Sequence, residues 1–302
     1  MKARIVISEF MDQPAVDSLA ARHDVDYRPR LVDDAAGLQA ALPGAAAWIV
    51  RNRTPVRGPL LEVARDVRVI GRLGVGLDNI DVDACARRGI EVIPATGANA
   101  ESVAEYVVSA AMVLLRGSFF STRAVEAGTW PRQTLSQGRE AAGKVMGIVG
   151  YGNIGRLTAR KAEALGMKVM SYDSQVPDAS TRDLDSLLAQ ADVVSLHIPL
   201  TTQTRGMLDA KRLGIMKRDA ILINTARGGI VDEAVLATML REGRLGGAAL
   251  DVFDNEPLPA GSPLAGAPRL LLTPHIAGVT VESNERVSAL IAQRVLEALD
   301  RG

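Results

Sequence analysis

The stretch KVMGIVGYGNIGR, residues 144–156, decides the fold. It opens as a short apolar run, which is typical of a strand buried in a parallel sheet. A G-x-G-x-x-G sequence follows, made by Gly150, Gly152 and Gly155, and a helical pattern covers 154–165. A strand that leads through a glycine loop directly into a helix is the first part of a βαβ unit. The stretch therefore predicts an α/β domain with a parallel sheet.

Strand and helix patterns continue in both directions from this stretch. Downstream, a helix over 232–242 is expected among apolar runs at 167–173, 191–197, 219–225, 245–251 and 269–275. Upstream, a second series has a helix at 13–21 and strands at 3–8, 23–27, 46–51, 67–74 and 90–94. A long helix over 100–116 connects the two series, and a last helix covers 281–300. This alternation predicts two doubly wound parallel-sheet domains.

The composition limits the classes of partner. Of the 302 residues, 47% are hydrophobic and 3% are aromatic, so aliphatic side chains must fill the cores. Lys plus Arg and Asp plus Glu are 35 each, which gives no overall attraction to nucleic acid or to an acidic membrane. Cys85 is the only cysteine, so we expect no disulfide framework and no Cys-rich metal site, and we predict no metal-binding residues. The N-terminal apolar run is too short for a signal peptide, and we expect a soluble, cytoplasmic protein.

The glycine loop has the pattern of a dinucleotide-binding turn. Gly150 allows the tight turn, Gly152 lets backbone N–H groups approach a pyrophosphate, and Gly155 lets the helix pack closely on the strand. Asp173 ends the next strand, 18 residues after Gly155, where a carboxylate accepts hydrogen bonds from ribose hydroxyls and repels a 2′-phosphate. We therefore predict NAD rather than NADP. The alternative is that Asp173 is only a surface turn residue.

An arginine follows the strand that ends at Asn224. Ligands of open parallel sheets collect at the carboxyl ends of strands, which is where Arg227 lies. Its guanidinium is suited to hold a carboxylate or to polarise a carbonyl. Gly228 and Gly229 let the chain turn beside it, and Asp232 caps the next helix. The alternative is an exposed arginine in a glycine turn.

Glu256 and His275 follow the last two strands of the series. His275 can transfer a proton near neutral pH, and the carboxylate of Glu256 would favour the imidazolium and orient it. The pair is suited to protonate a ketone oxygen while a hydride reaches the carbon. The alternative for a histidine after proline is a structural role. His23 has no supporting motif, and His197 ends a strand beside the cofactor loop, where it is better placed to line the site than to act as an acid.

Taken together, the sequence resembles the D-isomer-specific 2-hydroxyacid dehydrogenases, and within them the phosphoglycerate dehydrogenase-like branch. The matching blocks keep the family's order over most of the chain; they are VRNRT (50–54), GRLGVGLDNID (71–81), TGANAESVAEY (96–106), GIVGYGNIGR (147–156), SLHIPLT (195–201), INTARGGIVDE (223–233), AALDVFDNEP (248–257) and TPHIAG (273–278).

The resemblance implies two Rossmann-like domains with the active site in the cleft between them. Residues 1–98 plus 279–302 would form a discontinuous, flavodoxin-like substrate-binding domain, and 99–278 an NAD-binding Rossmann domain. The segment 117–143 resembles the family's dimerisation region, so a homodimer is expected. Because the chain stops at Gly302, after the family's closing helix, we expect no regulatory domain.

The resemblance also implies the site residues. The catalytic set maps onto Arg227, Glu256 and His275. The backbone of Leu73, Gly74, Val75 and Gly76 would hold the substrate carboxylate, with Asn99 at the hinge. Asp251 would meet the nicotinamide amide, and the complete set of implied cofactor contacts is Gly150, Tyr151, Gly152, Asn153, Ile154, Gly155, Asp173, His197, Ile198, Pro199, Thr204, Thr225, Ala226, Asp251 and Gly278.

The choice of substrate depends on Arg51 and Arg53, which follow the third strand of the first series. Two arginines suggest a second anion besides the carboxylate, so we predict NAD-dependent, reversible hydride transfer with a 3-phosphoglycerate- or sulfolactate-type acid. The alternative for one of the pair is a surface ion pair. Hydroxypyruvate or glyoxylate reduction, or an NAD-responsive corepressor-like function, remains open. Formate oxidation is disfavoured, because the resemblance leads us to expect that a formate dehydrogenase has an amide where this chain has Glu256.

Overall fold

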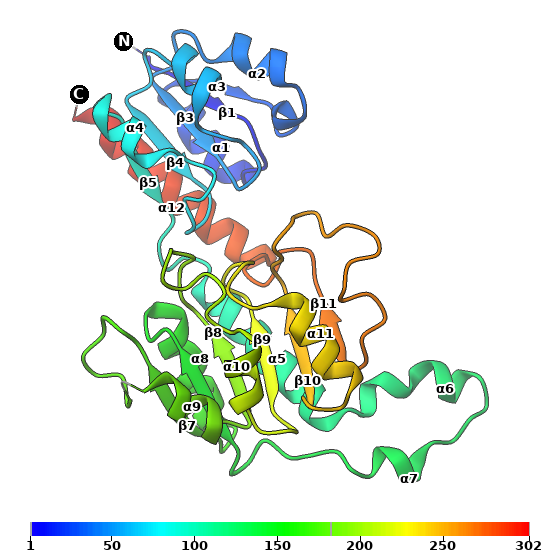
Figure 1. The fold of residues 1–302 in the computed structure, drawn as a ribbon. Helices are drawn as coiled ribbons and strands as arrows, with labels where there is room; N and C mark the ends of the chain where they lie inside the picture. Colours follow the sequence, from blue (N-terminus) through cyan, green and yellow to red (C-terminus); the bar gives the residue numbers. More distant parts are fainter. Residues whose placement is uncertain (1, 182, 302) are drawn as a thin grey trace. The chain divides into compact units, whose positions relative to one another are not determined.

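A computed structural model describes residues 2–181 and 183–301 (Figure 1). The chain divides into two compact units: unit 1 comprises Met1–Asn99 with Val279–Gly302, and unit 2 comprises Ala100–Gly278. The chain passes from unit 1 to unit 2 after Asn99, where helix α5 (Ala100–Arg116) begins. Each unit contains one parallel sheet with helices, which confirms the predicted fold class.

Unit 1 is built on a five-stranded sheet in the order β2-β1-β3-β4-β5, the strand order of flavodoxin-like folds. Every neighbouring pair is parallel. The strands are β1 (Arg4–Ile7), β2 (Asp24–Tyr27), β3 (Ala47–Val50), β4 (Val69–Arg72) and β5 (Glu91–Pro94). The connecting helices are α1 (Gln13–Ala20), the 3₁₀ turn η1 (Leu31–Asp33), α2 (Ala35–Ala41), α3 (Gly58–Val63) and α4 (Val82–Arg87).

The last helix of the chain, α12 (Val281–Asp300), belongs to unit 1. Thr280 caps its first turn by accepting a hydrogen bond from Ser283 N. The buried face packs on β4, where Gly71 removes the side chain that would otherwise meet Ile291 at 2.7 Å. The apolar residues of α12 recur at helical spacing, and together with α1 they cover one face of the unit 1 sheet.

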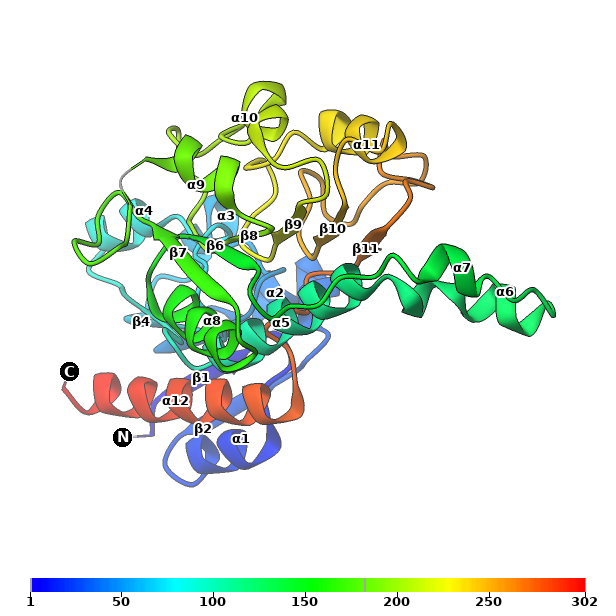
Figure 2. The ribbon, with the colours of Figure 1, turned by 90° about the horizontal axis from the view of Figure 1, so that it is seen from below.

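Unit 2 contains a six-stranded parallel sheet in the order β11-β10-β9-β8-β6-β7 (Figure 2). The order reverses between β6 and β8, which is the topological switch point where ligands of such sheets bind. The strands are β6 (Val145–Val149), β7 (Lys168–Tyr172), β8 (Val193–Leu196), β9 (Ile221–Asn224), β10 (Gly247–Leu250) and β11 (Leu270–Leu272). The helices are α5, α8 (Asn153–Ala164), α9 (Leu184–Gln190), α10 (Ala210–Ile215) and α11 (Glu233–Arg241).

Both faces of the unit 2 sheet are covered, which is why its strands read as continuous apolar runs. One core joins α9, α10 and α11 to the sheet, and the other joins α5 and α8 to it. Gly147 in β6 lets α9 approach, because a Cβ there would meet Leu187 at 2.6 Å. These close contacts fix where each strand ends and therefore where the loops that follow begin.

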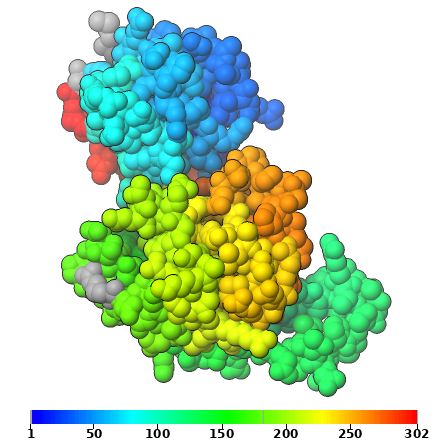
Figure 3. Space-filling model, in the orientation of Figure 1, coloured from blue at the N-terminus to red at the C-terminus, as the bar shows by residue number. Residues whose placement is uncertain are grey.

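An arm over residues 117–143 extends from the rest of unit 2 (Figures 2 and 3). It consists of the 3₁₀ turn η2 (Ser118–Ser121) and two short helices, α6 (Thr122–Glu126) and α7 (Arg132–Leu135). Phe119 is 66% and Trp130 77% exposed, and Phe120 and Val125 are also exposed.

In the described part of the chain, no single helix is long and apolar enough to cross a membrane. Helix α5 and the segment Ser118–Glu126 reach the required length and apolarity only when they are taken together, and a bend of 64° separates them.

Candidate active site

The glycine loop lies at the switch point of the unit 2 sheet. Gly150 has φ +100°, and a Cβ there would meet His197 O at 2.5 Å. Gly155 faces Gly150 O so closely that no side chain fits, whereas nothing lies within 4 Å of a Cβ at Gly152. No side chain at Gly152 caps helix α8. Two glycines therefore make the turn compact, and the third leaves space at the positive end of the helix, as a pyrophosphate requires.

Asp173 follows β7 and faces this loop. Its Oδ2 accepts a hydrogen bond from Tyr151 N at 2.7 Å, and its Oδ1 accepts from Gln175 N and Val176 N at 2.8 and 3.1 Å. The carboxylate therefore joins the glycine loop to the turn after β7. Each carboxylate oxygen has more than one lone pair, so these bonds leave Asp173 able to accept from a ribose hydroxyl as well.

The segment after β8 carries His197, Ile198 and Pro199. His197 Nε2 lies 2.9 Å from Ser195 Oγ, and burial lowers the pKa of His197 to about 3, so its ring is neutral. Thr204 donates to Pro199 O at 2.7 Å and holds the segment in place. A neutral, anchored ring is suited to line the cofactor site, and it is unsuited to act as an acid near neutral pH.

The turn after β9 is held by Asn224, whose Oδ1 accepts from Ala226 N at 3.0 Å while its Nδ2 donates to Arg227 O at 2.9 Å. Gly228 is required here, because any Cβ would collide with Phe253 O. Gly229 follows with φ +76°. The two glycines thus allow the segment after β10 to pass against the arginine turn, which brings the Arg227 segment next to the segment that carries Glu256.

Thr225 supplies an independent sign of a ligand. Its Oγ1 is buried and has no hydrogen-bond partner within the described residues. A buried hydroxyl without a partner is costly, and it is expected where a bound molecule completes its hydrogen bonds. Thr225 lies at the end of β9, at the same edge of the sheet as the glycine loop, so its environment fits a bound dinucleotide.

Glu256 and His275 form the pair predicted from the sequence. His275 Nδ1 lies 2.7 Å from Glu256 Oε2, and Glu256 Oε1 accepts from Phe253 N at 3.1 Å. Because a carboxylate only accepts, Nδ1 carries the hydrogen and Nε2 is the nitrogen left to exchange a proton. The two side chains are 35% and 34% exposed, so the imidazole is braced and still accessible.

The charges of this group are coupled. Burial raises the pKa of Glu256, but the hydrogen bond and charge of His275, the N–H of Phe253 and the charge of Arg227 outweigh it and hold the pKa below its ordinary value. Glu256 is therefore ionised near neutral pH. The charge of Arg227 helps to lower the pKa of Glu256, so its guanidinium lies near this carboxylate. The three predicted catalytic side chains are therefore grouped in unit 2.

In unit 1, the segment after β3 is organised by Glu9, which is 4% exposed. Its carboxylate accepts from the backbone N–H groups of Arg51, Arg53 and Thr54 at 2.8, 3.2 and 3.0 Å. Arg53 pairs with Asp33 at 2.5 Å and is 59% exposed, which is the surface ion pair left open by the sequence.

Arg51 has a different environment from Arg53. Its Nη2 donates to Asn284 Oδ1 on α12 at 2.8 Å, and its guanidinium lies 5.9 Å from the ring centroid of Phe10. Burial lowers the pKa of Arg51, and the nearby charge of Glu9 acts in the opposite direction. Arg51 is therefore oriented by neutral groups, and it is the better candidate of the two arginines for binding a ligand.

The predicted carboxylate-binding backbone follows β4. Gly74 has φ +149°, and Arg72 Nη1 fills the place of its missing side chain and donates to Leu73 O at 2.9 Å. Val75 is 37% exposed. Asn99, the last residue of this part of unit 1, has a buried Oδ1 with no partner in the described chain. The remaining predicted contact, Gly278, is the last residue of unit 2.

Sequence patterns did not indicate several residues that organise these sites. Asn224, Glu9 and Asn284 hold Arg227 or the Arg51 segment through hydrogen bonds that join positions as far apart as 233 residues. Only the position of Asn224 at a strand end could have suggested a role. The others form no motif, because their partners come together only after folding.

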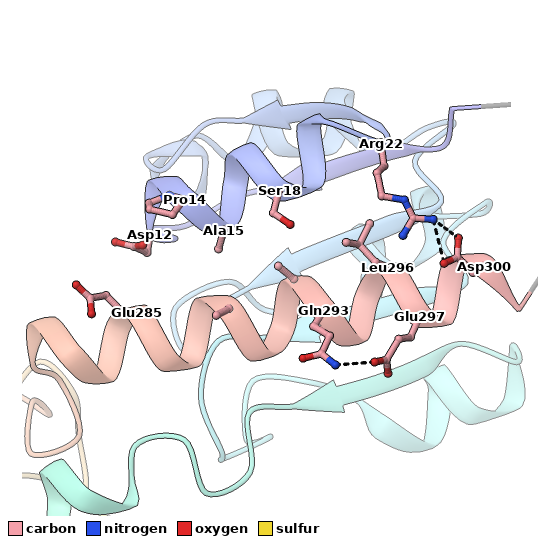
Figure 4. Close-up of a pocket in the computed structure, with 12 residues that line it drawn as sticks. Asp12, Pro14, Ala15, Ser18, Arg22, Glu285, Gln293, Leu296, Glu297 and Asp300 are labelled. Carbon is pink, nitrogen blue, oxygen red and sulfur yellow. Dashed lines mark hydrogen bonds and ion pairs between the residues drawn. The ribbon is translucent and has the colours of Figure 1, made fainter.

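A separate groove of about 620 Å³ lies between α1 and α12 of unit 1 (Figure 4). Its polar lining is mostly acidic, with Asp12, Glu285 and Glu297, and Arg22 is paired with Asp300 at 2.8 Å. None of the predicted site residues lines this groove, so we do not assign it to the reaction. Across residues 2–181 and 183–301, no group of three or more His, Cys, Asp or Glu side chains could hold a metal ion.

Comparisons with known proteins agree with this geometry. The family model described as "D-isomer specific 2-hydroxyacid dehydrogenase, NAD binding domain" matches residues 108–277. The chain is 52% identical to a (S)-sulfolactate dehydrogenase of Chromohalobacter salexigens over 98% of both chains. It is 37% identical to a D-3-phosphoglycerate dehydrogenase of Mycobacterium leprae, of which it spans 56%. A solved structure of a protein from Thermus thermophilus aligns with a TM-score of 0.90 at 33% identity, covering 99% of this chain and 97% of that one.

The family model covers more than half of the chain and includes the glycine loop, Arg227, Glu256 and His275. The two relatives named above share more than 30% of its residues over nearly its whole length, and both are named as dehydrogenases. The chain therefore belongs to the D-isomer-specific 2-hydroxyacid dehydrogenase family and is an NAD-dependent oxidoreductase.

Proposed function

We propose that the chain interconverts a 2-hydroxy acid and its 2-keto acid, and that the acid carries a sulfonate group. The observation that carries the catalytic part is the 2.7 Å contact between His275 and Glu256 in the same unit as the glycine loop and Arg227. In this proposal unit 2 binds NAD and performs the proton transfer, and Arg51 of unit 1 binds the sulfonate.

Each side chain of the group has a defined task. Bound NADH supplies the hydride that reaches C2 of the keto acid. His275 gives its Nε2 proton to the carbonyl oxygen, and it takes the proton back in the oxidative direction. Glu256 keeps the imidazole oriented, while Arg227 polarises the carbonyl and holds the neighbouring carboxylate.

Removing the carboxylate of Glu256 should lower the rate of the reaction. In Glu256→Gln the imidazole of His275 loses the ionised acceptor that orients it at 2.7 Å. We expect kcat for keto-acid reduction to fall about 10- to 100-fold with little change in KM for NADH, as small misplacements of a catalytic group do. Steady-state kinetics measure this, and a kcat equal to that of the wild type would contradict the role of Glu256.

The charges around Arg51 favour a sulfonate over a phosphate. Two arginines and two carboxylates, Glu9 and Asp33, lie in this part of unit 1, so the formal charges cancel. A phosphate ester carries a charge between −1.5 and −2 near neutral pH, whereas a sulfonate carries a single charge. One oriented guanidinium in a neutral neighbourhood suits the single charge better, and the similarity to a (S)-sulfolactate dehydrogenase supports the same choice.

A substrate panel with NADH tests this proposal. We expect 3-sulfopyruvate to have the highest kcat/KM among 3-sulfopyruvate, 3-phosphohydroxypyruvate, hydroxypyruvate, glyoxylate and pyruvate. Arg51→Met should lower kcat/KM for 3-sulfopyruvate about 10- to 100-fold, the value of a charged hydrogen bond, and should leave hydroxypyruvate nearly unchanged.

Arg53→Met is the matched control, since it removes an equal charge from the same segment but from a side chain already paired with Asp33. It should cost less than Arg51→Met. Equal losses with 3-sulfopyruvate and hydroxypyruvate in Arg51→Met would refute the sulfonate assignment. A preference for hydroxypyruvate or glyoxylate would favour the reductase alternative, and no turnover of any acid would favour a binding protein.

Asp173 supports a preference for NAD over NADP. Its carboxylate is fixed by three backbone N–H groups at the end of β7, so it cannot easily move away from a 2′-phosphate. Repulsion between these charges should make kcat/KM with NADPH far lower than with NADH. The same panel measured with both cofactors checks this, and a preference for NADPH would overturn it.

The arm over 117–143 supports a homodimer. Exposed aromatic side chains are enriched in protein interfaces, and this arm exposes Phe119, Phe120 and Trp130. Sedimentation should give a dimer for the wild type and a smaller species for the double variant Phe119→Ser, Trp130→Ser. A monomeric wild type would refute the dimer.

A cytoplasmic location stays a prediction from the sequence.

A further inference from the structure

The segment Thr273–Ala277 carries His275 in a backbone conformation that L-residues seldom adopt. The φ angle of His275 is +56°, in the left-handed region that favours glycine. A non-glycine residue remains there only where the surrounding structure fixes it. The contacts of this segment therefore decide whether the imidazole reaches Glu256.

Asp251, which is 2% exposed, fixes the segment on both sides of His275. Its backbone oxygen accepts from His275 N at 2.8 Å. Its carboxylate accepts from Ile276 N through Oδ1 and from Ala277 N through Oδ2, both at 2.8 Å. Hydrogen bonds to a buried carboxylate are stronger than neutral ones, so these contacts resist rotation of the backbone.

A hydroxyl chain ends on the same carboxylate. Thr273 Oγ1 lies 2.6 Å from Asp251 Oδ1 and 2.7 Å from the hydroxyl of Tyr106 on α5. The single Thr273 hydrogen must go to the carboxylate, which only accepts, so Tyr106 donates to Thr273. Burial raises the pKa of Tyr106, so the phenol keeps its proton at neutral pH.

We propose that Tyr106, Thr273 and Asp251 form a positioning chain that holds His275 against Glu256. The chain links helix α5 to the loop after β11, across 167 residues of sequence. Tyr106 and Thr273 are assigned no contact with substrate or cofactor, and they act by fixing the backbone that carries His275. This proposal rests on the role of His275 given under Proposed function.

Thr273→Val and Tyr106→Phe test the chain without altering Asp251, whose predicted contact with nicotinamide would confuse the result. We expect Thr273→Val to lower kcat about 10- to 100-fold, as small misplacements of a catalytic group do, with little change in KM for NADH. Tyr106→Phe should lower kcat about 2- to 10-fold, the value of one neutral hydrogen bond. Thr273→Ser, which keeps the hydroxyl, should restore most of the activity.

Thr158→Val is the matched control. The buried Thr158 hydroxyl lies within helix α8, whereas Thr225 follows β9 at the ligand-binding edge of the sheet. Thr158 has no hydrogen-bond partner among the residues described and no part in the Tyr106–Thr273–Asp251 chain, so its loss should leave kcat unchanged. If Thr273→Val fails to fold, Tyr106→Phe, which keeps the ring, decides the test. Values of kcat within about twofold of wild type in the folded variants would overturn the proposal, because one neutral hydrogen bond is worth at least that much.

A proton signal gives a second measurement that needs neither cofactor nor substrate. The Nδ1 hydrogen of His275, shared with Glu256, should give a downfield resonance that is assigned by its loss in His275→Gln. We expect Thr273→Val to shift or broaden it and Thr158→Val to leave it in place; an unchanged signal in Thr273→Val would overturn the proposal. A wild type that turns over no keto acid would count against the proposed function instead, while this signal would still test the chain.

Discussion

We expect His275→Gln to lower kcat for keto-acid reduction by about 10³-fold, within the range that general acid–base catalysis contributes. Glutamine retains a polar side chain of similar reach, but it cannot deliver a proton from the Nε2 position. The contact with Glu256 shows that the carboxylate is already in place to orient the ring, so the loss should fall on kcat and much less on KM. Steady-state kinetics with NADH and the best acid of the panel measure it.

His23→Gln is the matched control for this variant. His23 lies in unit 1, where its Nδ1 accepts from Ala3 N at 3.2 Å, and no proposed role in the reaction is assigned to it. It should retain the wild-type kcat. A His275→Gln enzyme that keeps more than about a tenth of the wild-type kcat would contradict the assignment, since acid–base catalysis is worth at least 10²-fold.

Arg227→Lys should reduce kcat/KM by about 10²- to 10³-fold, although the charge is kept. Losing one hydrogen-bond donor aimed at developing charge has an effect of this size. Lysine is a point charge and lacks the planar fork that engages a carbonyl and a carboxylate together. The Asn224 bonds hold the turn without the guanidinium and should keep the backbone in place, although the bond from Arg227 Nη1 to Ala226 O at 2.5 Å is lost.

Arg244→Lys provides the comparison for Arg227→Lys. Arg244 is an exposed side chain that pairs with Glu242 at 3.2 Å, so its replacement should be neutral. Thermal unfolding should show both variants near the wild-type transition. Equal kcat/KM for Arg227→Lys and wild type would mean that Arg227 does not contact the reacting groups.

Local sequence patterns predicted most of the fold. The apolar runs around β6 and β9 place each strand to within two residues, because strands covered on both faces must be continuously apolar. The glycine loop was recognisable since steric limits leave only glycine at Gly150 and Gly155. Helix α12 was visible from its spacing, but only the resemblance assigned it to the first domain, because periodicity does not say which sheet a helix covers.

The candidate site was predicted less completely than the fold. Arg227, Glu256 and His275 could be found because each follows a predicted strand, and the carboxyl ends of parallel strands meet at one edge. The pairing of Arg53 with Asp33 and the bond from Tyr106 to Thr273 could not, because they join residues 20 and 167 positions apart. Such contacts depend on how elements pack, which no local pattern records.

Isotope transfer follows the hydride from NADH to C2 of the keto acid. NADH deuterated at the transferred position of nicotinamide is incubated with enzyme and 3-sulfopyruvate, and the product is analysed by NMR and mass spectrometry. We expect sulfolactate with one deuterium on C2, formed far more slowly by His275→Gln. Consumption of NADH without deuterium on C2, or product formation at an equal rate by His275→Gln, would show that this reaction is not the one that His275 catalyses.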